Sequence, residues 1–83
     1  MPVTVKLFGA LREFLPAGSG FNSCQLSIAP GQLLGEVLSQ LPIPGHKPYL
    51  VIVNDEKIDS KDYASIQIHE NDEIVLLPPI KGG

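Results

Sequence analysis

Several features that mark common protein classes are missing from this chain of 83 residues. It has one cysteine, Cys24, so no internal disulfide can form, and it has no Cys-x-x-Cys pair or Cys/His cluster of the kind that binds zinc. No apolar run reaches the roughly 18 residues of a membrane span, and the N-terminus lacks the charged-then-apolar pattern of a secretion signal. We therefore expect a cytoplasmic protein that binds neither a metal nor a membrane.

Positive charge is also scarce in the chain. Lysine and arginine together number 6 against 9 acidic residues, which leaves a net charge of −3 and no basic stripe. A nucleic-acid partner would need a basic surface to neutralise its phosphates, so we expect none. The acidic residues cluster between Asp55 and Glu73, which favours a partner protein with a basic surface.

The hydrophobic pattern predicts one small domain made mainly of strands. A chain of this length buries only a limited core, which restricts it to a simple topology. Alternating apolar and polar residues predict half-buried strands, and a nearly all-apolar run predicts a strand at or near the sheet centre that is buried on both sides. In chain order the predicted strands are residues 2–8, 21–28, 49–53 and 74–77, with Cys24 pointing inward and a turn at 54–57.

One convincing helix is predicted between the second and third strands. Its apolar residues recur at spacings of one, three and four before Pro42 ends it: Leu33, Leu34, Val37, Leu38 and Leu41. Gly35 lowers helix propensity by about 1 kcal/mol relative to alanine, so it marks either close backbone packing on the sheet or an ordinary surface glycine. A short helical turn is expected at residues 10–15. This order of elements predicts an α+β fold of the ubiquitin-like β-grasp type, a small mixed sheet packed on one main helix.

Three side chains stand apart from this pattern. Phe8 lies on the polar side of the first strand, with Thr4 and Lys6. A large aromatic residue there marks either an exposed binding patch or a position covered by a neighbouring loop. His46 and His69 have no partner at ligand spacing, so we expect both to face solvent.

The last six residues, Pro78-Pro79-Ile80-Lys81-Gly82-Gly83, follow the final strand directly. Two prolines hold φ near −65° and favour an extended chain, whereas two glycines can pass where a larger residue would collide with a wall. Such an arm presents the α-carboxylate of its last residue. A diglycine end alone is also typical of a frayed terminus or a cloning remnant, but the strand and prolines before it favour a functional arm. We therefore expect a β-grasp domain at residues 1–77 and a flexible tail at 78–83.

Three segments carry a resemblance to a known family: Phe8-Gly9-Ala10-Leu11-Arg12-Glu13, Asn71-Asp72-Glu73-Ile74-Val75, and Leu77-Pro78-Pro79-Ile80-Lys81-Gly82-Gly83. The first is similar to a strand end followed by a Leu-Arg-Glu turn, and the second to a Gly-Asp-Glu-Val segment that leads into the last strand. The third is similar to a Pro-Pro-Val-x-Gly-Gly tail, whose double proline is the most specific element. Together they resemble the ubiquitin-related sulfur carriers, and most closely the small subunits of molybdopterin synthase.

The resemblance implies a carrier that is no enzyme on its own and binds no cofactor. An ATP-dependent activating enzyme would adenylate Gly83, and sulfur would then replace the adenylate to form a thiocarboxylate. Gly82 and Gly83 would enter the large subunit of molybdopterin synthase, where a pterin precursor receives the sulfur. Partner contacts would come from the tail, the outward sheet face and, more weakly, two lysines: Phe8, Leu77, Pro78, Pro79, Ile80, Lys57 and Lys81. Leu77 fits ordinary core packing equally well.

Three other functions fit the same residues. In a ubiquitin-like protein modifier, the activated Gly83 would be joined to a lysine of a target, and the Lys-Gly-Gly ending resembles the basic-Gly-Gly ending of ubiquitin. A sulfur carrier for thiazole, and hence thiamine, or for another sulfur-containing metabolite would use the same activation. A β-grasp interaction module without chemistry would retain its function after deletion of Gly82 and Gly83.

Overall fold

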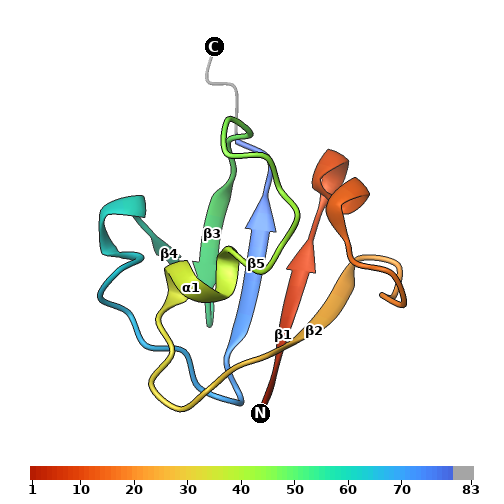
Figure 1. Ribbon diagram of the computed structural model, residues 1–83. Helices are drawn as coiled ribbons and strands as arrows, with labels where there is room; N and C mark the ends of the chain where they lie inside the picture. The colour runs from red at the N-terminus through yellow and green to blue at the C-terminus, as the bar shows by residue number, and fades with distance from the viewer. Residues whose placement is uncertain (80–83) are drawn as a thin grey trace.

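The computed structural model describes residues 1–79, which form a five-stranded sheet with an α-helix across one face (Figure 1). The strands are β1 (Pro2–Leu7), β2 (Ser23–Ser27), β3 (Leu50–Val53), β4 (Glu56–Ile58) and β5 (Glu73–Leu77). The α-helix is α1 (Leu34–Leu38), and the 3-10 helices are η1 (Gly9–Phe14) and η2 (Ser60–Asp62). η1 occupies the segment in which the sequence predicted a helical turn.

The strand order across the sheet is β2-β1-β5-β3-β4. β1 and β5 are parallel, and the other three neighbouring pairs are antiparallel. Parallel neighbours need a crossover connection, and α1 lies within the one that leads from β1 to β5. A mixed sheet crossed by one main helix is the ubiquitin-like β-grasp architecture, which confirms the fold predicted from the sequence. β3 lies beside the central strand β5, as its apolar run predicted.

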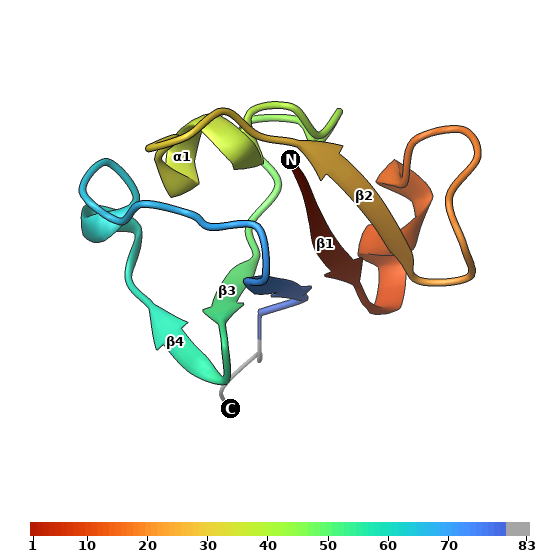
Figure 2. The ribbon, with the colours of Figure 1, turned by 90° about the horizontal axis from the view of Figure 1, so that it is seen from below.

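α1 lies over one face of the sheet (Figure 2), and alternate residues of the strands are buried and form the core. The inner side of β1 is buried as predicted, since Val3, Val5 and Leu7 are at most 1% exposed. Cys24 also points inward as predicted, and burial raises the pKa of its thiol. The other buried core residues lie in β2, β3, β5, η1, α1 and the loops: Leu11, Leu26, Ile28, Leu34, Val37, Leu38, Leu41, Val51, Val53, Ile68, Ile74 and Leu76.

The helix is shorter than the apolar spacing predicted. Leu33 is extended rather than helical, with φ −88° and ψ 153°, and it forms an isolated bridge with Gln67. The backbone N–H of Leu33 donates to Oε1 of Glu36 at 2.8 Å, which satisfies one donor at the start of α1. From Gln40 onward the backbone bonds change to a three-residue spacing, and the last of them joins Leu41 N to Leu38 O at 3.1 Å. The chain therefore buries Leu41 through a tighter turn rather than another α-helical turn.

Two finer expectations about packing were wrong. β3 is not buried on both sides, because Val51 and Val53 are buried while Leu50 and Ile52 are partly exposed. The helix covers only one face of the sheet, so the other face of β3 has no layer above it within residues 1–79. Gly35 packs closely on the segment after η2 rather than on the sheet, since its N–H donates to Tyr63 O at 3.0 Å.

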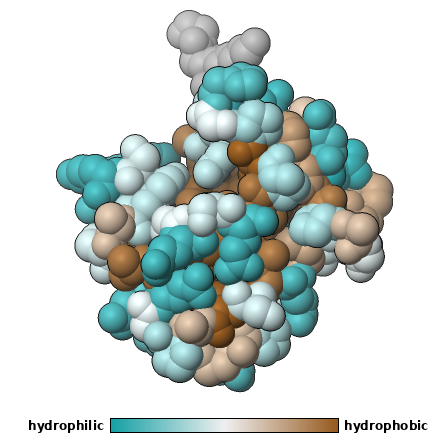
Figure 3. All heavy atoms as spheres, in the orientation of Figure 1, coloured by the Kyte–Doolittle hydropathy of each residue, from teal (hydrophilic) through white to brown (hydrophobic). Residues whose placement is uncertain are grey.

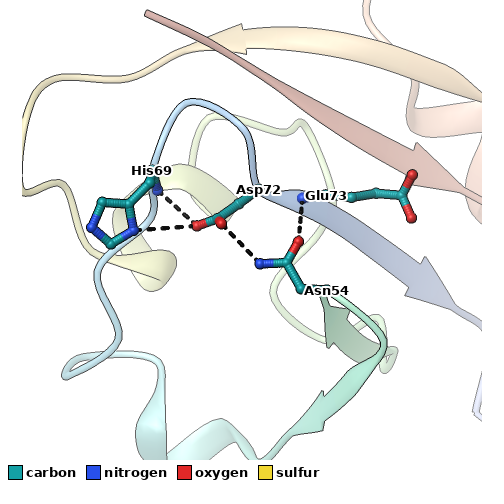
Figure 4. A network of polar contacts seen from close by, with 4 residues as sticks. All are labelled: Asn54, His69, Asp72 and Glu73. Carbon is teal, nitrogen blue, oxygen red and sulfur yellow. Dashed lines mark hydrogen bonds and ion pairs between the residues drawn. The ribbon is translucent and has the colours of Figure 1, made fainter.

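A polar network joins the β3–β4 turn to the start of β5 (Figure 4). The Asn54 side chain donates to Oδ1 of Asp72 at 2.8 Å and accepts from the N–H of Glu73 at 2.9 Å. The other carboxylate oxygen of Asp72 accepts from the N–H of His69 at 2.8 Å. Partial burial raises the pKa of the Asp72 carboxyl, but these hydrogen bonds outweigh that effect and hold the pKa below its usual value. The network closes the end of the sheet opposite the tail.

The remaining loop predictions agree with the structure. His46 and His69 are exposed, as expected for residues without a ligand partner. The predicted turn at 54–57 narrows to Asn54 and Asp55, both at positive φ, because the next residues already belong to β4. Among residues 1–79, no helix is long and apolar enough to span a bilayer.

Candidate functional site

The tail begins directly after Leu77, the last residue of β5. Pro78 and Pro79 are exposed and belong to the described residues. The predictions for Ile80, Lys81, Gly82 and Gly83 lie outside the described part of the chain, so they remain predictions. The structure instead shows how the sheet directs the chain into the tail.

β5 is paired on both sides up to its last residue, and it stops there because the next residue is a proline. Leu77 pairs with Leu50 of β3, and Leu76 O accepts from the N–H of Phe8 at 3.1 Å. The next residue, Pro78, has no N–H and cannot extend the hydrogen-bonded ladder. β1 leaves the sheet at the same level, because Gly9 turns the chain into η1 with φ +59°. The central strand therefore continues as a tail while its neighbour bends away.

The sheet face away from α1 carries five apolar side chains near this exit. Strand alternation places Leu50 and Ile52 of β3 and Val75 and Leu77 of β5 on this face, and Phe8 follows β1 beside them. All five are partly exposed. None is among the partly buried residues that pack against the core: Phe14, Leu15, Ile43, Tyr49, Ile58, Tyr63 and Ile66. We call Phe8, Leu50, Ile52, Val75 and Leu77 the outer patch.

The exposure of Phe8 and Leu77 bears on the alternatives that the sequence left open for their packing. Phe8 is neither fully covered by a loop nor packed into the core, so the structure favours the patch interpretation. Leu77 likewise takes no part in the core, which disfavours ordinary core packing. By contrast, the α1 side of the molecule mixes hydrophilic and hydrophobic residues over its visible surface (Figure 3).

Lysines border the outer patch on both sides, and each has a carboxylate partner. Lys57 of β4 pairs in register with Ile52, and its Nζ lies 3.2 Å from Oδ1 of Asp59. Lys6 of β1 pairs in register with Val75, and its Nζ lies 3.0 Å from a carboxylate oxygen of Glu73. Lys57 was predicted as a weak partner contact, and the structure places it at the edge of the patch. The side chains of the Lys57–Asp59 pair are 60% and 61% exposed and those of the Lys6–Glu73 pair 37% and 45%, so exchanging a carboxylate for one on a partner would cost least at Lys57.

Sequence reasoning missed three of the five patch residues, namely Leu50, Ile52 and Val75. Each lies in a continuous apolar run, in which the sequence does not distinguish the inner side from the outer. The apolar pattern does not show whether helices cover one face of the sheet or both. Had the single helix been taken to cover one face only, the alternate residues of 49–53 and 74–77 would have been assigned to an open face.

No group of three or more His, Cys, Asp and Glu side chains within residues 1–79 is arranged to hold a metal ion. Around the tail exit lie Ala10, Leu11, Lys47 and Pro48, none of which forms a nucleophile and base pair. What the arrangement offers chemically is an apolar surface beside an emerging chain end, which suits binding and presentation.

Comparisons with known proteins agree with this description. The chain is similar to the crystal structure of SAMP1 from Haloferax volcanii, with 21% sequence identity, a TM-score of 0.68 and full coverage of both chains. It is also similar to the solution structure of the small archaeal modifier protein 1 from Methanosarcina acetivorans, with 26% identity, a TM-score of 0.67, and 99% and 96% of the two chains covered. No curated protein sequence matches the chain.

A family model extends the comparison to nearly the whole sequence, including the tail. The model described as the ThiS family matches residues 5–83. This match covers β1 from Val5 onward, the central strand β5, the outer patch and the diglycine end. The chain therefore belongs to the ThiS family of ubiquitin-like sulfur carriers.

Proposed function

We propose that this chain carries sulfur as a thiocarboxylate on Gly83 and delivers it to a pterin precursor in the synthesis of molybdopterin. The observation that carries the proposal is the continuation of the central strand into Pro78-Pro79 and a terminal diglycine, beside an apolar patch that the core does not use. The double proline is the element that favours the molybdopterin pathway over the thiazole carriers of the same fold.

The chemistry at Gly83 requires activation by a partner. A carboxylate is a poor electrophile at neutral pH, so one of its oxygens attacks the α-phosphorus of ATP and pyrophosphate leaves. The acyl-adenylate has a good leaving group, and a sulfur nucleophile attacks its carbonyl carbon. A C–S bond forms and the C–O bond to AMP breaks. With sulfide as the nucleophile the thiocarboxylate and AMP result directly, whereas a persulfide donor leaves an acyl disulfide, whose S–S bond a second thiol reduces to free the thiocarboxylate. ATP is bound and used by the activating enzyme, so this chain supplies only the carboxylate and the means of docking.

In this proposal the outer patch is the surface that docks on the partner proteins. An apolar patch next to the tail exit would bind the activating enzyme, and later the large subunit of molybdopterin synthase, with the tail aimed into the partner. Apolar and aromatic anchors surrounded by paired charges match the usual anatomy of protein interfaces, with an apolar centre and a polar rim. Lys6 and Lys57 supply the charged rim, with their carboxylate partners Glu73 and Asp59.

Protein modification is the second candidate function. The structure from Methanosarcina acetivorans, 26% identical to this chain, is named as a small archaeal modifier protein, and the chain ends in Lys-Gly-Gly. Activation of Gly83 is shared by both functions. They differ in the acceptor, which is a sulfur atom for the carrier and a lysine of a target for the modifier.

Intact-mass analysis of the protein purified from its native host tests the proposal. A gain of about 16 Da, the replacement of one oxygen by sulfur, supports the carrier function, whereas a ladder of covalent conjugates supports the modifier. A variant with one alanine added after Gly83 is the matched control, because it keeps residues 1–79 unchanged and moves the carboxylate away from the diglycine. If that variant still supported molybdopterin synthesis with purified activating enzyme and large subunit, the carrier proposal would be wrong.

A further inference from the structure

The tail exit contains a contact that the proposed function does not by itself explain. β1 and β5 run parallel with Leu7 opposite Leu76, so Gly9 and Pro78 come to the same level just beyond the last paired residues. A Cβ atom built on Gly9 would lie 2.7 Å from Cγ of Pro78 and 3.5 Å from its Cδ. Real Cβ atoms essentially never come within 3.0 Å of another heavy atom, so the proline ring occupies the space that a side chain at position 9 would need.

Gly9 is held in this position independently of the tail. Its carbonyl oxygen accepts from Nε of Arg12 at 3.3 Å, and Leu11 N–H donates to Phe8 O at 3.2 Å. The Arg12 guanidinium also stacks on the Phe21 ring, 4.4 Å from its centroid. The backbone at Gly9 is therefore held by its bonds to η1, and a side chain added there would collide with the Pro78 ring. These contacts anchor the Gly9 turn, whereas Pro78 begins the tail beyond the last paired strand residue, so Pro78 is the group that moves.

The tail base has neighbours from two segments of the chain. Pro78 and Pro79 line an apolar hollow of about 210 Å³ together with Ala10 and Leu11 of η1 and Lys47 and Pro48, which precede β3. The tail base thus lies between the turn after β1 and the loop before β3. Proline fixes its own φ, so the placement of the Pro78 ring also sets the direction in which the following residues start.

We propose that Gly9 is a positioning residue for the tail: the absence of its side chain lets Pro78 pack on the turn after β1, and this packing sets the direction in which the diglycine is presented to the activating enzyme. The inference rests on the proposed activation of Gly83. It assigns to Gly9 a role through Pro78 and no contact with the reacting atoms.

Gly9→Ala tests the inference, and Gly18→Ala is its matched control. Both glycines have positive φ, +59° and +86°, so alanine brings backbone strain to each. A Cβ on Gly18 meets nothing within 4 Å, whereas a Cβ on Gly9 meets Pro78. The two variants therefore share the strain and differ in the collision. Gly9→Asn serves as a second variant, because asparagine tolerates positive φ better than alanine does and still carries a Cβ.

The kinetic measurement is kcat/KM for adenylation of each full-length variant by the purified activating enzyme, followed by ATP–pyrophosphate exchange. A displacement on the order of 1 Å can lower a rate about a hundredfold, so we expect Gly9→Ala and Gly9→Asn to lose tenfold to a hundredfold in kcat/KM. Gly18→Ala should stay close to wild type, and all variants should melt cooperatively. Equal kcat/KM for Gly9→Ala and Gly18→Ala in the presence of an active wild type would overturn the inference and leave the proposed function intact. No exchange with wild type would instead count against the proposed function.

A rescue experiment and an NMR measurement separate positioning from general damage. Pro78→Ala removes the Cγ atom that the new Cβ would meet, so adding it to Gly9→Ala should cost less than the two single changes combined. Additive losses would contradict the role of this contact. In wild type we also expect a nuclear Overhauser effect between Gly9 Hα and Pro78 Hγ, and its loss in Gly9→Ala but not in Gly18→Ala. Its absence from wild type would refute the packing on which the inference depends.

Discussion

The three phenylalanines of the chain allow the docking role of the outer patch to be tested with changes of identical chemistry. Phe8 belongs to the patch, Phe14 packs against the core from η1, and Phe21 is 81% exposed. Replacing each in turn by alanine removes the same atoms from three different surroundings. We predict that Phe8→Ala weakens binding to the activating enzyme, Phe14→Ala lowers stability, and Phe21→Ala changes both properties only slightly.

The magnitudes follow from what each ring contacts. A fully buried Phe→Ala change costs about 3–5 kcal/mol, so the partly buried Phe14 should lose about 2 kcal/mol of unfolding free energy. At about 4–8 °C per kcal/mol for a domain of this size, its melting temperature should fall by roughly 8–16 °C. Phe8 makes no core contact, so its stability loss should be about 1 kcal/mol or less, the range of strand propensity. An aromatic anchor at an interface centre contributes about 2 kcal/mol or more, which corresponds to roughly a 30-fold weaker Kd for Phe8→Ala.

The assay is a titration of each variant with the purified activating enzyme by calorimetry, alongside thermal unfolding of the free chain. Phe14→Ala is measured well below its melting temperature so that binding is compared between folded proteins. Phe21→Ala controls for the loss of an exposed aromatic ring, and it also removes the Arg12 stacking, worth about 0.5–1 kcal/mol at an exposed site. A Phe8→Ala variant with unchanged Kd and a large drop in melting temperature would make Phe8 a core residue and refute the docking role of the patch.

Two further predictions concern the tail and the polar network at the opposite end of the sheet. Gly82→Val should leave the melting temperature nearly unchanged, because every residue of the described core precedes it in the chain and substitutions outside a core usually change stability by about 0.5 kcal/mol or less. The same variant should block thiocarboxylate formation if the diglycine threads a narrow passage, and unimpaired product by mass spectrometry would count against that passage. Asp72→Asn should lower stability at pH 7 by about 1–2 kcal/mol through weakened hydrogen bonds with Asn54 and His69. The Asp72 pKa is lowered in the folded state, so its stabilisation is fully present above the unfolded value near 3.9 and is lost as pH falls through the folded value. Urea unfolding at pH 7 and at pH 2.5 should therefore show a gap between wild type and variant that shrinks in acid, and a constant gap would contradict the assigned role.

The sequence by itself determined the local structure and the chemistry of the chain end. Alternation of apolar and polar residues located β1 and β2, since a strand with one solvated face must place every second side chain in the core. The spacing of Leu34, Val37 and Leu38 located α1 for the same kind of reason, with the helical period in place of the strand period. Pro78-Pro79 and the diglycine defined the tail, because the properties of proline and glycine are carried by the residues themselves.

The tertiary structure decided which residues share a surface. Leu50, Ile52 and Val75 lie in runs where every residue is apolar, so only the pairing of β3 with β5 and the single layer of helix show that these three face outward beside Phe8. Gly9 lies against Pro78 although they are 69 positions apart in the sequence, because a parallel β1–β5 pairing brings both strand ends to one level. Strand register is a cooperative property of distant segments, and a slip of one residue would exchange the two faces of a strand. Local patterns therefore predicted β1, β2, β3, β5 and the helix but not the short strand β4, whose residues were assigned to a turn. The non-local pairing of β1 with β5 created the surface and the exit from which the tail emerges.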